Sequence, residues 1–571
     1  MIKRFSLIFI LIYSCIHLSF AQDIIQSRQY PKNYFRYPLD LPPVTAGSFG
    51  ELRPNHFHSG LDFKTNQTTG YPVHAVFDGY VSRLRVQFGG FGNALYITHP
   101  NGCTTVYGHI ERLAPAIAKL VRDYQYKQQS FEVDFKLLPN QIQVCKDEIV
   151  GWSGNAGASE GPHLHFEIRD TQSEETINAQ LFGLSIPDRV PPTIYAIGIY
   201  HLNGNPFSEK TPRQFLQVKG SKGNYHLISP GVINLNGAIG FGLTANDMTS
   251  VSPNHNGIYS VELKLDGKTV YTFAVERFGF DQTHAINAYL DFPEYFKTHR
   301  WMQKCFILPG SHISLYPQSV NRGIINFNDN ALHQLEYVVK DVAGNTSTLN
   351  LKIKAGQGLT PAVAKPAGVL FHYDQLNEFT APNVKVTIPV GNLYDDLDFV
   401  YASYPKKPGT YSAIHSIHNR LTPIHDAYDL WIKPDSSIGK YAGKAVIVSK
   451  TGQCEGGLFQ DGYVKTQAHS FGDFYIRVDT IPPVIVPLNI KNGAKLASAK
   501  KISFRMSDNL SGIKTYSGSI DGKWVLMEWD FKTKVLSYTF TADIAAGKHL
   551  LDLVVTDNKN NAANFKAEFY R

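Results

Sequence analysis

The sequence predicts an all-β, multidomain protein with an antiparallel β-sheet head followed by tandem β-sandwiches. Charged residues make up 18% of the chain, whereas it contains 35 Phe, 31 Tyr, 46 Gly and 31 Pro. Aromatic residues suit a pleated surface, and Gly and Pro suit the turns between short strands. A chain of 571 residues exceeds one ordinary hydrophobic core, so we expect three or four domains.

The N-terminus has the pattern of a secretory signal peptide. Lys3 and Arg4 precede the apolar run FSLIFILIYSCIHLSF, and Ser19 and Ala21 place small residues where a signal peptidase cleaves. We therefore expect a signal peptide over residues 1–21 and an exported, periplasmic or extracellular protein. No later stretch approaches the roughly 18 apolar residues that a membrane-spanning helix needs, which predicts a mature chain without a transmembrane span.

The five cysteines leave two questions open. Cys15 lies within the apolar run and offers lipoprotein acylation as an alternative to a cleaved signal. Cys103 and Cys145 are either a disulfide pair or buried small residues, because spacing alone does not show pairing. No C-x-x-C pair occurs, so a thiolate zinc site is not supported.

The net charge indicates no nucleic-acid partner. The formal charge of +7 is spread over the whole chain, and no dense stripe of Lys and Arg is present. Mild basicity is compatible with an anionic envelope polymer.

The head is expected over residues 45–187, after a linker at 22–44. From Val73 short alternating runs are separated by Asp-Gly and Asn-Gly turns, the pattern of consecutive hairpins. Between 114 and 144 the pattern changes: residues recur at helical spacing, which predicts a short amphipathic helix within an insertion (Ile117, Leu120, Val121 and Tyr124). This insertion is either a lid or wall over a cleft or a surface excursion without a role.

An internal repeat follows the head. DRVPPTI at Asp188 recurs as DTIPPVI at Asp479, LDGK recurs as IDGK, and LEYVVKD recurs as LDLVVTD in the same order. Two units, 188–355 and 479–571, fit immunoglobulin-like β-sandwiches, the first with an insertion around 272–330. The intervening segment 356–478 is a β-rich domain of uncertain type. Such domains offer surfaces for an envelope partner.

The stretch EGPHLHFEI carries metal-capable side chains on one face of a predicted strand. Side chains alternate along a strand, so His163, His165 and Glu167 share one side while the apolar residues between them share the other. Upstream, NHFHSGLDF contains His58 and Asp62, and TVYGHI contains His109 at the end of a predicted strand. Two histidines and one carboxylate hold a catalytic zinc with one coordination position open.

The motifs HSGLD, YGH and GPHLHFE, in that order, resemble the lysostaphin-like (LytM-type) zinc endopeptidases, which cleave peptide bridges of peptidoglycan on a duplicated-hybrid-motif β-fold. The resemblance covers roughly residues 45–172. It implies that one zinc per chain is bound by His58, Asp62 and His165, and that His109 and His163 are the catalytic histidines. Either of these two takes the proton from the attacking water. Glu167 either accepts a hydrogen bond from a ligating histidine or forms a salt bridge.

The expected function is therefore a secreted zinc metalloendopeptidase that hydrolyses peptide cross-links of peptidoglycan. One alternative is a catalytically silent member of the same fold that activates another wall hydrolase. Another is a surface adhesin or scaffold in which the β-sandwiches are the binding modules. The sequence does not determine which peptide bond is cleaved.

Overall fold

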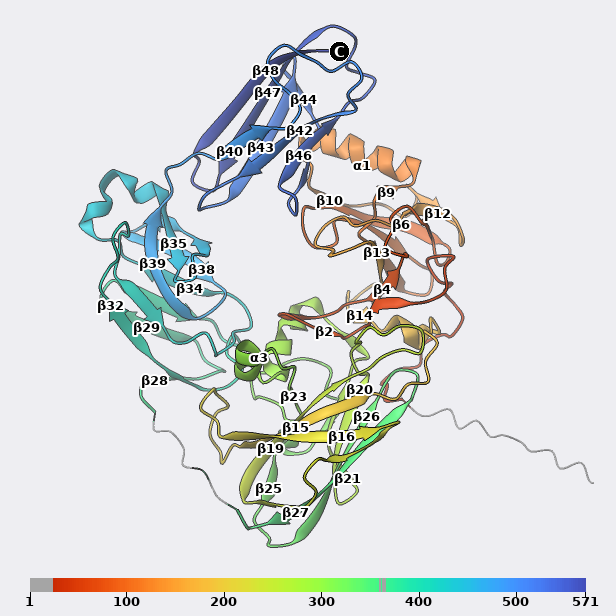
Figure 1. Cartoon of the computed structure of the whole chain (residues 1–571), viewed down its shortest axis with the longest axis vertical. Helices are drawn as coiled ribbons and strands as arrows, with labels where there is room; N and C mark the ends of the chain where they lie inside the picture. Colours follow the sequence, from red (N-terminus) through yellow and green to blue (C-terminus); the bar gives the residue numbers. More distant parts are fainter. Residues whose placement is uncertain (1–23, 359–360, 362–365) are drawn as a thin grey trace, which may run out of the picture.

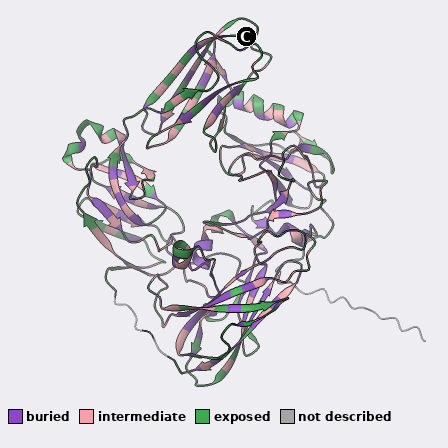
Figure 2. Ribbon diagram, in the orientation of Figure 1, coloured by how far each residue is buried: buried purple, intermediate pink, exposed green. Residues whose placement is uncertain are grey.

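The computed structural model describes residues 24–358, 361 and 366–571, so the predicted signal peptide and Cys15 lie outside the described residues. Strands dominate throughout, which confirms the predicted all-β, multidomain class. Figure 1 shows the chain arranged as a ring, in which the C-terminal domain returns to the side of the head. In Figure 2 the buried residues concentrate inside each sheet-rich body of this ring.

The head is built on one antiparallel sheet whose order is β1-β4-β13-β8-β7-β6-β10. The central strand β13 pairs with β4 on one side and with β8 on the other. A three-stranded sheet, β5-β12-β9, and the hairpin β2-β3 accompany it. The strands are β1 (Thr45–Gly47), β2 (Leu52–Arg53), β3 (His56–Phe57), β4 (Leu61–Lys64), β5 (Pro72–His74), β6 (Gly79–Val86), β7 (Asn93–Thr98), β8 (Cys103–Gly108), β9 (Arg112–Leu113), β10 (Val133–Lys136), β11 (Gln143–Val144), β12 (Ile149–Trp152), β13 (His163–Asp170) and β14 (Thr176–Ile177), and the 3₁₀ helix η1 (Ala179–Phe182) follows.

The segment 114–144 contains the helix α1 (Pro115–Gln128) and the strands β10 and β11. Pro115 is the first residue of the helix, a position where the missing N–H of proline costs no hydrogen bond. Ile117 and Val121 lie on the buried face of the helix. Strand β10 pairs with β6 at the sheet edge, and the three strands β8, β7 and β6 separate it from β13. The segment therefore widens the sheet at its far edge.

The second body, residues 188–355, packs on the head and shares its hydrophobic core. One cluster of buried apolar side chains runs from Phe35 through Phe166 to Ile353. Strand β14 of the head also pairs with β22 of the second body. Its large sheet has the order β23-β19-β15-β16-β17-β27-β26-β20-β21-β24, with β18 and β25 attached to β27 and β19.

The elements of the second body are β15 (Thr193–His201), β16 (Arg213–Ser221), β17 (Asn224–Leu227), β18 (Val232–Leu235), β19 (Gly237–Asn246), β20 (Ser260–Leu265), β21 (Lys268–Ala274), β22 (Arg277–Phe278), η2 (Phe280–Ala285), α2 (Ile286–Tyr289), α3 (Phe292–Thr298), β23 (Gln303–Lys304), β24 (Gln318–Ser319), η3 (Asn321–Gly323), β25 (Ile325–Phe327), β26 (Leu332–Lys340) and β27 (Thr346–Ala355). Helices η2, α2 and α3 fall in the stretch where the sequence predicts an insertion.

The third and fourth bodies are β-sandwiches with cores of their own. The third contains β28 (Val369–Phe371), β29 (Asn377–Ala381), β30 (Val384–Ile388), β31 (Leu397–Phe399), β32 (Tyr401–Tyr404), β33 (Ile414–Ile417), β34 (Tyr428–Ile432), η4 (Ser436–Lys444), β35 (Ala445–Ser449), β36 (Cys454–Gly456), β37 (Leu458–Gln460), β38 (Tyr463–Ala468) and β39 (Gly472–Val478). The fourth contains β40 (Val484–Pro487), β41 (Ala494–Lys495), β42 (Lys501–Ser507), β43 (Ile513–Ile520), β44 (Lys523–Val525), β45 (Glu528–Asp530), β46 (Val535–Thr539), β47 (Lys548–Asp557) and β48 (Ala562–Tyr570).

The sequence repeat is also a repeat of contacts. In the second body Asp266, in the turn between β20 and β21, accepts hydrogen bonds from His333 Nδ1 and the backbone N–H of Gln334. In the fourth body Asp521 accepts the same pair of bonds from His549 and Leu550. Equivalent turn residues thus fix equivalent strands in both units.

The fourth body touches the head and closes the ring (Figure 1). Trp529 meets Phe88 with ring centroids 5.2 Å apart, and Trp524 meets Tyr126 of α1 at the same distance. Lys532 Nζ donates to the backbone oxygens of Asn155 at 2.6 Å and Ser159 at 3.2 Å. The insertion 114–144 therefore supplies part of the docking surface for the C-terminal domain.

Cys103, Cys145, Cys305 and Cys454 are all free thiols, so the structure contains no bond between Cys103 and Cys145. Within the described ranges, no helix combines the length and apolar character needed to span a membrane.

Candidate metal centre

Two strands and the turn before them bring His58, Asp62 and His165 together. Asp62 on β4 lies directly opposite His165 on β13 in the antiparallel pairing, so their side chains project to the same face. His58 Nε2 lies 3.1 Å from His165 Nδ1 and 3.1 Å from Asp62 Oδ1, and the third edge, from His165 Nδ1 to Asp62 Oδ1, is 2.8 Å. All three side chains are buried. The structure thus joins the three residues for which the resemblance implies metal binding.

Hydrogen bonds on the far side of each ring determine which nitrogen faces the centre. His58 Nδ1 donates to the backbone oxygen of Ser48 at 2.7 Å, so in the neutral ring Nε2 carries no proton and presents its lone pair. His165 Nε2 donates to Glu167 Oε1 at 2.9 Å, which turns Nδ1 toward Asp62 Oδ1. Nε2 of His58 and Nδ1 of His165 therefore both face the same carboxylate oxygen. Histidines that bind metal are held by this kind of outer hydrogen bond.

His109 and His163 stand beside this centre with the same arrangement. His109 Nδ1 donates to the backbone oxygen of Ala156 at 2.8 Å, and His163 Nδ1 donates to that of Gly161 at 2.8 Å. Their ring centroids are 4.7 Å apart, and His163 Nε2 lies 3.4 Å from Asp62 Oδ1. His109 follows the end of β8 with φ of 59°, an uncommon conformation for a residue other than glycine. Each ring therefore turns its Nε2 away from the backbone acceptor and toward the centre.

Burial and neighbouring charges separate the protonation states of these groups. Burial lowers the pKa of His58 to about 4, and burial together with His165 and His163 lowers the pKa of His109 to about 3. Burial also opposes a charge on His165, but its hydrogen bonds to Asp62 and Glu167 outweigh it and raise its pKa to about 9. The site therefore favours one positive charge between Asp62 and Glu167.

Glu167 is fully buried and serves both roles that the sequence left open. One oxygen accepts from His165 and from Ser59 Oγ, and the other forms a salt bridge with Arg169 at 2.6 Å. Burial raises the pKa of Glu167, but Arg169 and His165 outweigh burial and lower it to about 2. The carboxylate is therefore an anion that orients His165.

The donor set fits a metal cation. Two imidazole lone pairs and a carboxylate oxygen within 3.1 Å of one another repel unless a proton or a cation lies between them. Two nitrogens and one oxygen are ligands that zinc accepts, and three protein ligands leave its fourth position open. His58, Asp62 and His165 form one of the groups of acidic and imidazole side chains in the described chain that are placed to bind a metal.

Sequence reasoning missed several residues that position the site. Arg53 forms an ion pair with the second oxygen of Asp62, and Phe91 stacks on His165 with ring centroids 4.9 Å apart. The backbone oxygens of Ser48 and Ala156 fix His58 and His109. Main-chain acceptors leave no signal in a sequence.

Glycine is required where two loops of the site touch. Gly92 has φ of +63°, and a Cβ there would lie 2.5 Å from the backbone of Ala156 and Gly157. Any side chain would push the two loops apart. This contact holds Ala156 where its oxygen accepts the bond from His109.

Comparison with known families agrees with this geometry. Residues 56–129 match the model of peptidase family M23, and residues 368–479 match that of the Zu5-like domain. The second match covers the third body, whose type the sequence left undetermined.

Curated relatives match a part of the chain. The DD-carboxypeptidase/endopeptidase Mpg of Neisseria meningitidis serogroup B is 33% identical over 112 residues, which cover 20% of this chain and 20% of that protein. The peptidoglycan DD-endopeptidase ShyA of Vibrio cholerae is 27% identical over 162 residues, which cover 27% of this chain and 31% of that protein. The chain spans about a fifth of the length of the first of these relatives.

Among solved structures, the catalytic domain of the prophage-encoded M23 protein EnpA from Enterococcus faecalis is 23% identical, with 27% of this chain and 97% of that one covered and a TM-score of 0.19. The catalytic domain of lysostaphin from Staphylococcus simulans is 23% identical, with 24% and 90% covered and a TM-score of 0.17.

Proposed function

Because residues 56–129 belong to a peptidase family M23 domain of the LytM type, we propose that this protein is a secreted zinc metalloendopeptidase that hydrolyses peptide cross-links of bacterial peptidoglycan. The observation that carries the proposal is the convergence of His58 Nε2, Asp62 Oδ1 and His165 Nδ1 within 3.1 Å of one another. The curated relatives named for peptidoglycan DD-endopeptidase activity support the substrate class.

His58, Asp62 and His165 would hold one zinc ion, which when bound lowers the pKa of a water and polarises a carbonyl. His109 and His163 turn their Nε2 atoms toward that centre, so one of them can take a proton and return it to the leaving amine. The low pKa of His109, about 3, keeps its ring neutral at pH 7. Arg53 and Glu167 hold Asp62 and His165 in place.

A catalytically silent activator is the second candidate. The complete set of five site residues favours an enzyme, because a protein that only docks has no need of two free imidazoles beside a metal centre. The third and fourth bodies, with cores of their own, would bind an envelope partner or position the head.

The test measures zinc content and hydrolysis with purified mature protein. We expect about one zinc per chain and new amino termini released from peptidoglycan sacculi. His165→Ala should lose the metal and the activity, whereas His109→Ala should keep the metal and lose the activity. His56→Ala is the matched control, because this histidine lies two residues from His58 but is exposed. Stoichiometric zinc with no hydrolysis would favour the silent activator, and unchanged activity in both site variants would refute the enzyme.

A further inference from the structure

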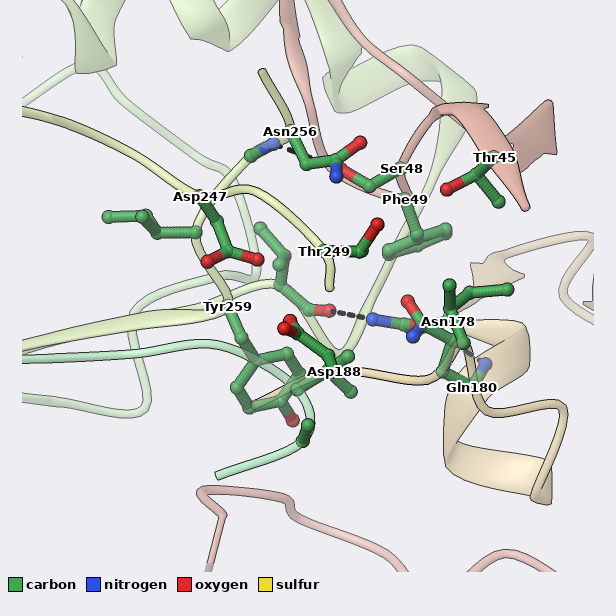
Figure 3. A pocket seen from close by; sticks show the side chains of 16 residues that line it. Thr45, Ser48, Phe49, Asn178, Gln180, Asp188, Asp247, Thr249, Asn256 and Tyr259 are labelled. Atoms are coloured by element: carbon green, nitrogen blue, oxygen red, sulfur yellow. Dashed lines mark hydrogen bonds between the residues drawn. The ribbon is translucent and has the colours of Figure 1, made fainter. Parts of the chain in front are cut away.

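A second cluster of acidic side chains lies where the head meets the second body. Asp188 precedes the Pro-Pro pair, Asp247 follows β19, and Asp341 follows β26. One oxygen from each lies within 4.8 Å of the others. Figure 3 shows the carboxylates of Asp188 and Asp247 turned toward each other. Both residues line a cavity of about 30 Å³, and Val342 and Ala343, which follow Asp341, line it too.

Buried polar atoms in this cavity have no partner. Asp247 is 5% exposed, and its Oδ1 makes no hydrogen bond within the described part of the chain. Asn256 is 4% exposed, and neither its Oδ1 nor its Nδ2 has a hydrogen-bond partner there. The two residues form an isolated antiparallel bridge, so their side chains lie on the same side of the backbone, and both line the cavity (Figure 3). Burial of polar atoms without hydrogen-bond partners destabilises a fold, so these atoms favour a ligand that supplies the missing contacts.

The carboxylates also repel one another. Asp247 and Asp341 are buried and Asp188 is half-buried, so little water screens the repulsion among their negative charges. A cation among the three oxygens would remove this repulsion and supply a partner for Asp247 Oδ1.

Hydrogen bonds hold the carboxylates of Asp188 and Asp341 in position. Asp188 Oδ1 accepts from the backbone N–H of Val190 at 2.9 Å. Asp341 accepts from the backbone N–H of Asn345 at 2.9 Å and from its side-chain amide at 2.7 Å. These bonds hold two of the three oxygens in place before any ligand arrives, which lowers the ordering cost of binding.

We propose that Asp188, Asp247 and Asp341 bind a divalent cation of the Ca²⁺ class, independently of the zinc centre. The donors are oxygens, which a hard cation prefers, whereas zinc and other transition metals favour nitrogen and sulfur. The amide oxygen of Asn256 and the hydroxyl of Thr249 line the same cavity and offer further oxygen ligands. Calcium tolerates irregular oxygen coordination and accepts water for the ligands a protein does not supply, whereas Mg²⁺ demands a near-ideal octahedron.

The position of the site gives it a structural effect on the head. The same cavity is lined by Ser48, whose Oγ accepts the backbone N–H of Gly257 at 2.9 Å and whose backbone oxygen accepts from His58. A cation at the triad thus stabilises the loop that carries Asn256 and Gly257, and with it the contact between the second body and the segment that holds His58.

The repeat places a matching triad, Asp479, Asp508 and Asp557, in the fourth body. Some of its hydrogen bonds match those of the first triad. Asp557 accepts from Asn561 as Asp341 does from Asn345, and among the described residues Asp508 Oδ1 is unpartnered like that of Asp247. Asp508 is only half-buried, so the proposal concerns the first triad alone. No variant below changes this second triad, so any calcium that it binds contributes equally to the wild type and to each variant.

The test compares calcium binding by the full-length, zinc-loaded chain and by Asp247→Asn. Titration with CaCl₂, followed by calorimetry and by metal analysis after dialysis, should show one more calcium per chain in the wild type, or an affinity reduced by about tenfold or more in the variant. Asp188→Asn should behave like Asp247→Asn. Asp266→Asn is the matched control, because it removes a negative charge from the same body at an exposed turn and should bind calcium like the wild type.

Thermal unfolding separates a binding role from a merely structural one. Calcium should raise the melting temperature of the wild type and leave that of Asp247→Asn unchanged. In calcium-free buffer Asp247→Asn should melt at the same temperature as the wild type or at a higher one. The reason is that the substitution replaces one of three carboxylates that repel one another by a neutral amide. Equal calcium content in the wild type and both variants, or a wild-type melting temperature that ignores calcium, would overturn the proposal. If Asp247→Asn does not fold, Asp188→Asn decides by the same measurements.

Discussion

Replacing Glu167 by glutamine tests how far one buried carboxylate supports the metal centre. Glu167 has no exposed surface and accepts from His165 and Ser59 with one oxygen and from Arg169 with the other. Glutamine has one acceptor oxygen and one NH₂ group, so in either orientation it turns a donor toward His165 or toward Arg169. The variant keeps the shape of the side chain but loses one charged hydrogen bond.

The expected magnitudes follow from that lost bond. A hydrogen bond to a charged partner contributes about 1.5–3 kcal/mol, so Glu167→Gln should lower the free energy of unfolding by about 2 kcal/mol. Glu167→Ala should cost about 3–5 kcal/mol, because it leaves Arg169 buried without an anion. Loss of an outer partner of a ligating histidine weakens metal binding by about 10- to 100-fold, and we expect that range for zinc in Glu167→Gln.

Competition with a chromophoric chelator measures the zinc affinity, and denaturant unfolding measures stability. Asp134→Asn is the control: this exposed residue pairs with Arg83 on the same sheet and should change stability by at most about 1 kcal/mol and zinc affinity not at all. A folded Glu167→Gln protein with wild-type zinc affinity would show that Glu167 does not position His165.

Trp529→Ala should weaken the contact between the fourth body and the head, since an edge-to-face aromatic pair contributes about 0.5–1.5 kcal/mol beyond the area it buries. Lys532→Ala should act in the same direction, and small-angle scattering should report a larger radius of gyration for the double variant. Unchanged dimensions in the double variant would contradict a ring held by these contacts. The third body should be sensitive to acid, because burial lowers the pKa of His415 and of His418 to about 4. Protonation then favours the unfolded chain, so stability falls as the pH decreases from about 6.5 to 4, by up to about 3 kcal/mol per histidine. His415→Gln should flatten the dependence of that calorimetric transition on pH and the exposed His226→Gln should not; identical slopes would contradict this cause. Burial also lowers the pKa of Lys304 to about 7, so stability should rise with pH from about 7 to 10, and Lys304→Met should remove that rise in a melting-temperature series.

The sequence by itself determined the strand-rich class, the repeat and the set of histidines and carboxylates at the candidate metal centre. Alternation along EGPHLHFEI depends only on backbone geometry, so it places His163, His165 and Glu167 on one face in any strand. The ordered motifs then indicated which upstream residues join them.

Only the tertiary structure decided what surrounds those side chains. The acceptors for His58 and His109 are backbone oxygens of Ser48 and Ala156, which any residue type would provide. The pairing of Asp188 with Asp247 and Asp341 likewise depends on loops more than 50 residues apart, although the repeated Asp-x-x-Pro-Pro motif was visible in the sequence. Local patterns record the direction of a side chain along its own strand, whereas contacts between distant loops arise from the packing of the whole fold. Because of that packing, the head and the second body share one hydrophobic core. The same packing brings Lys532 of the C-terminal domain to Asn155, in the loop that precedes His163.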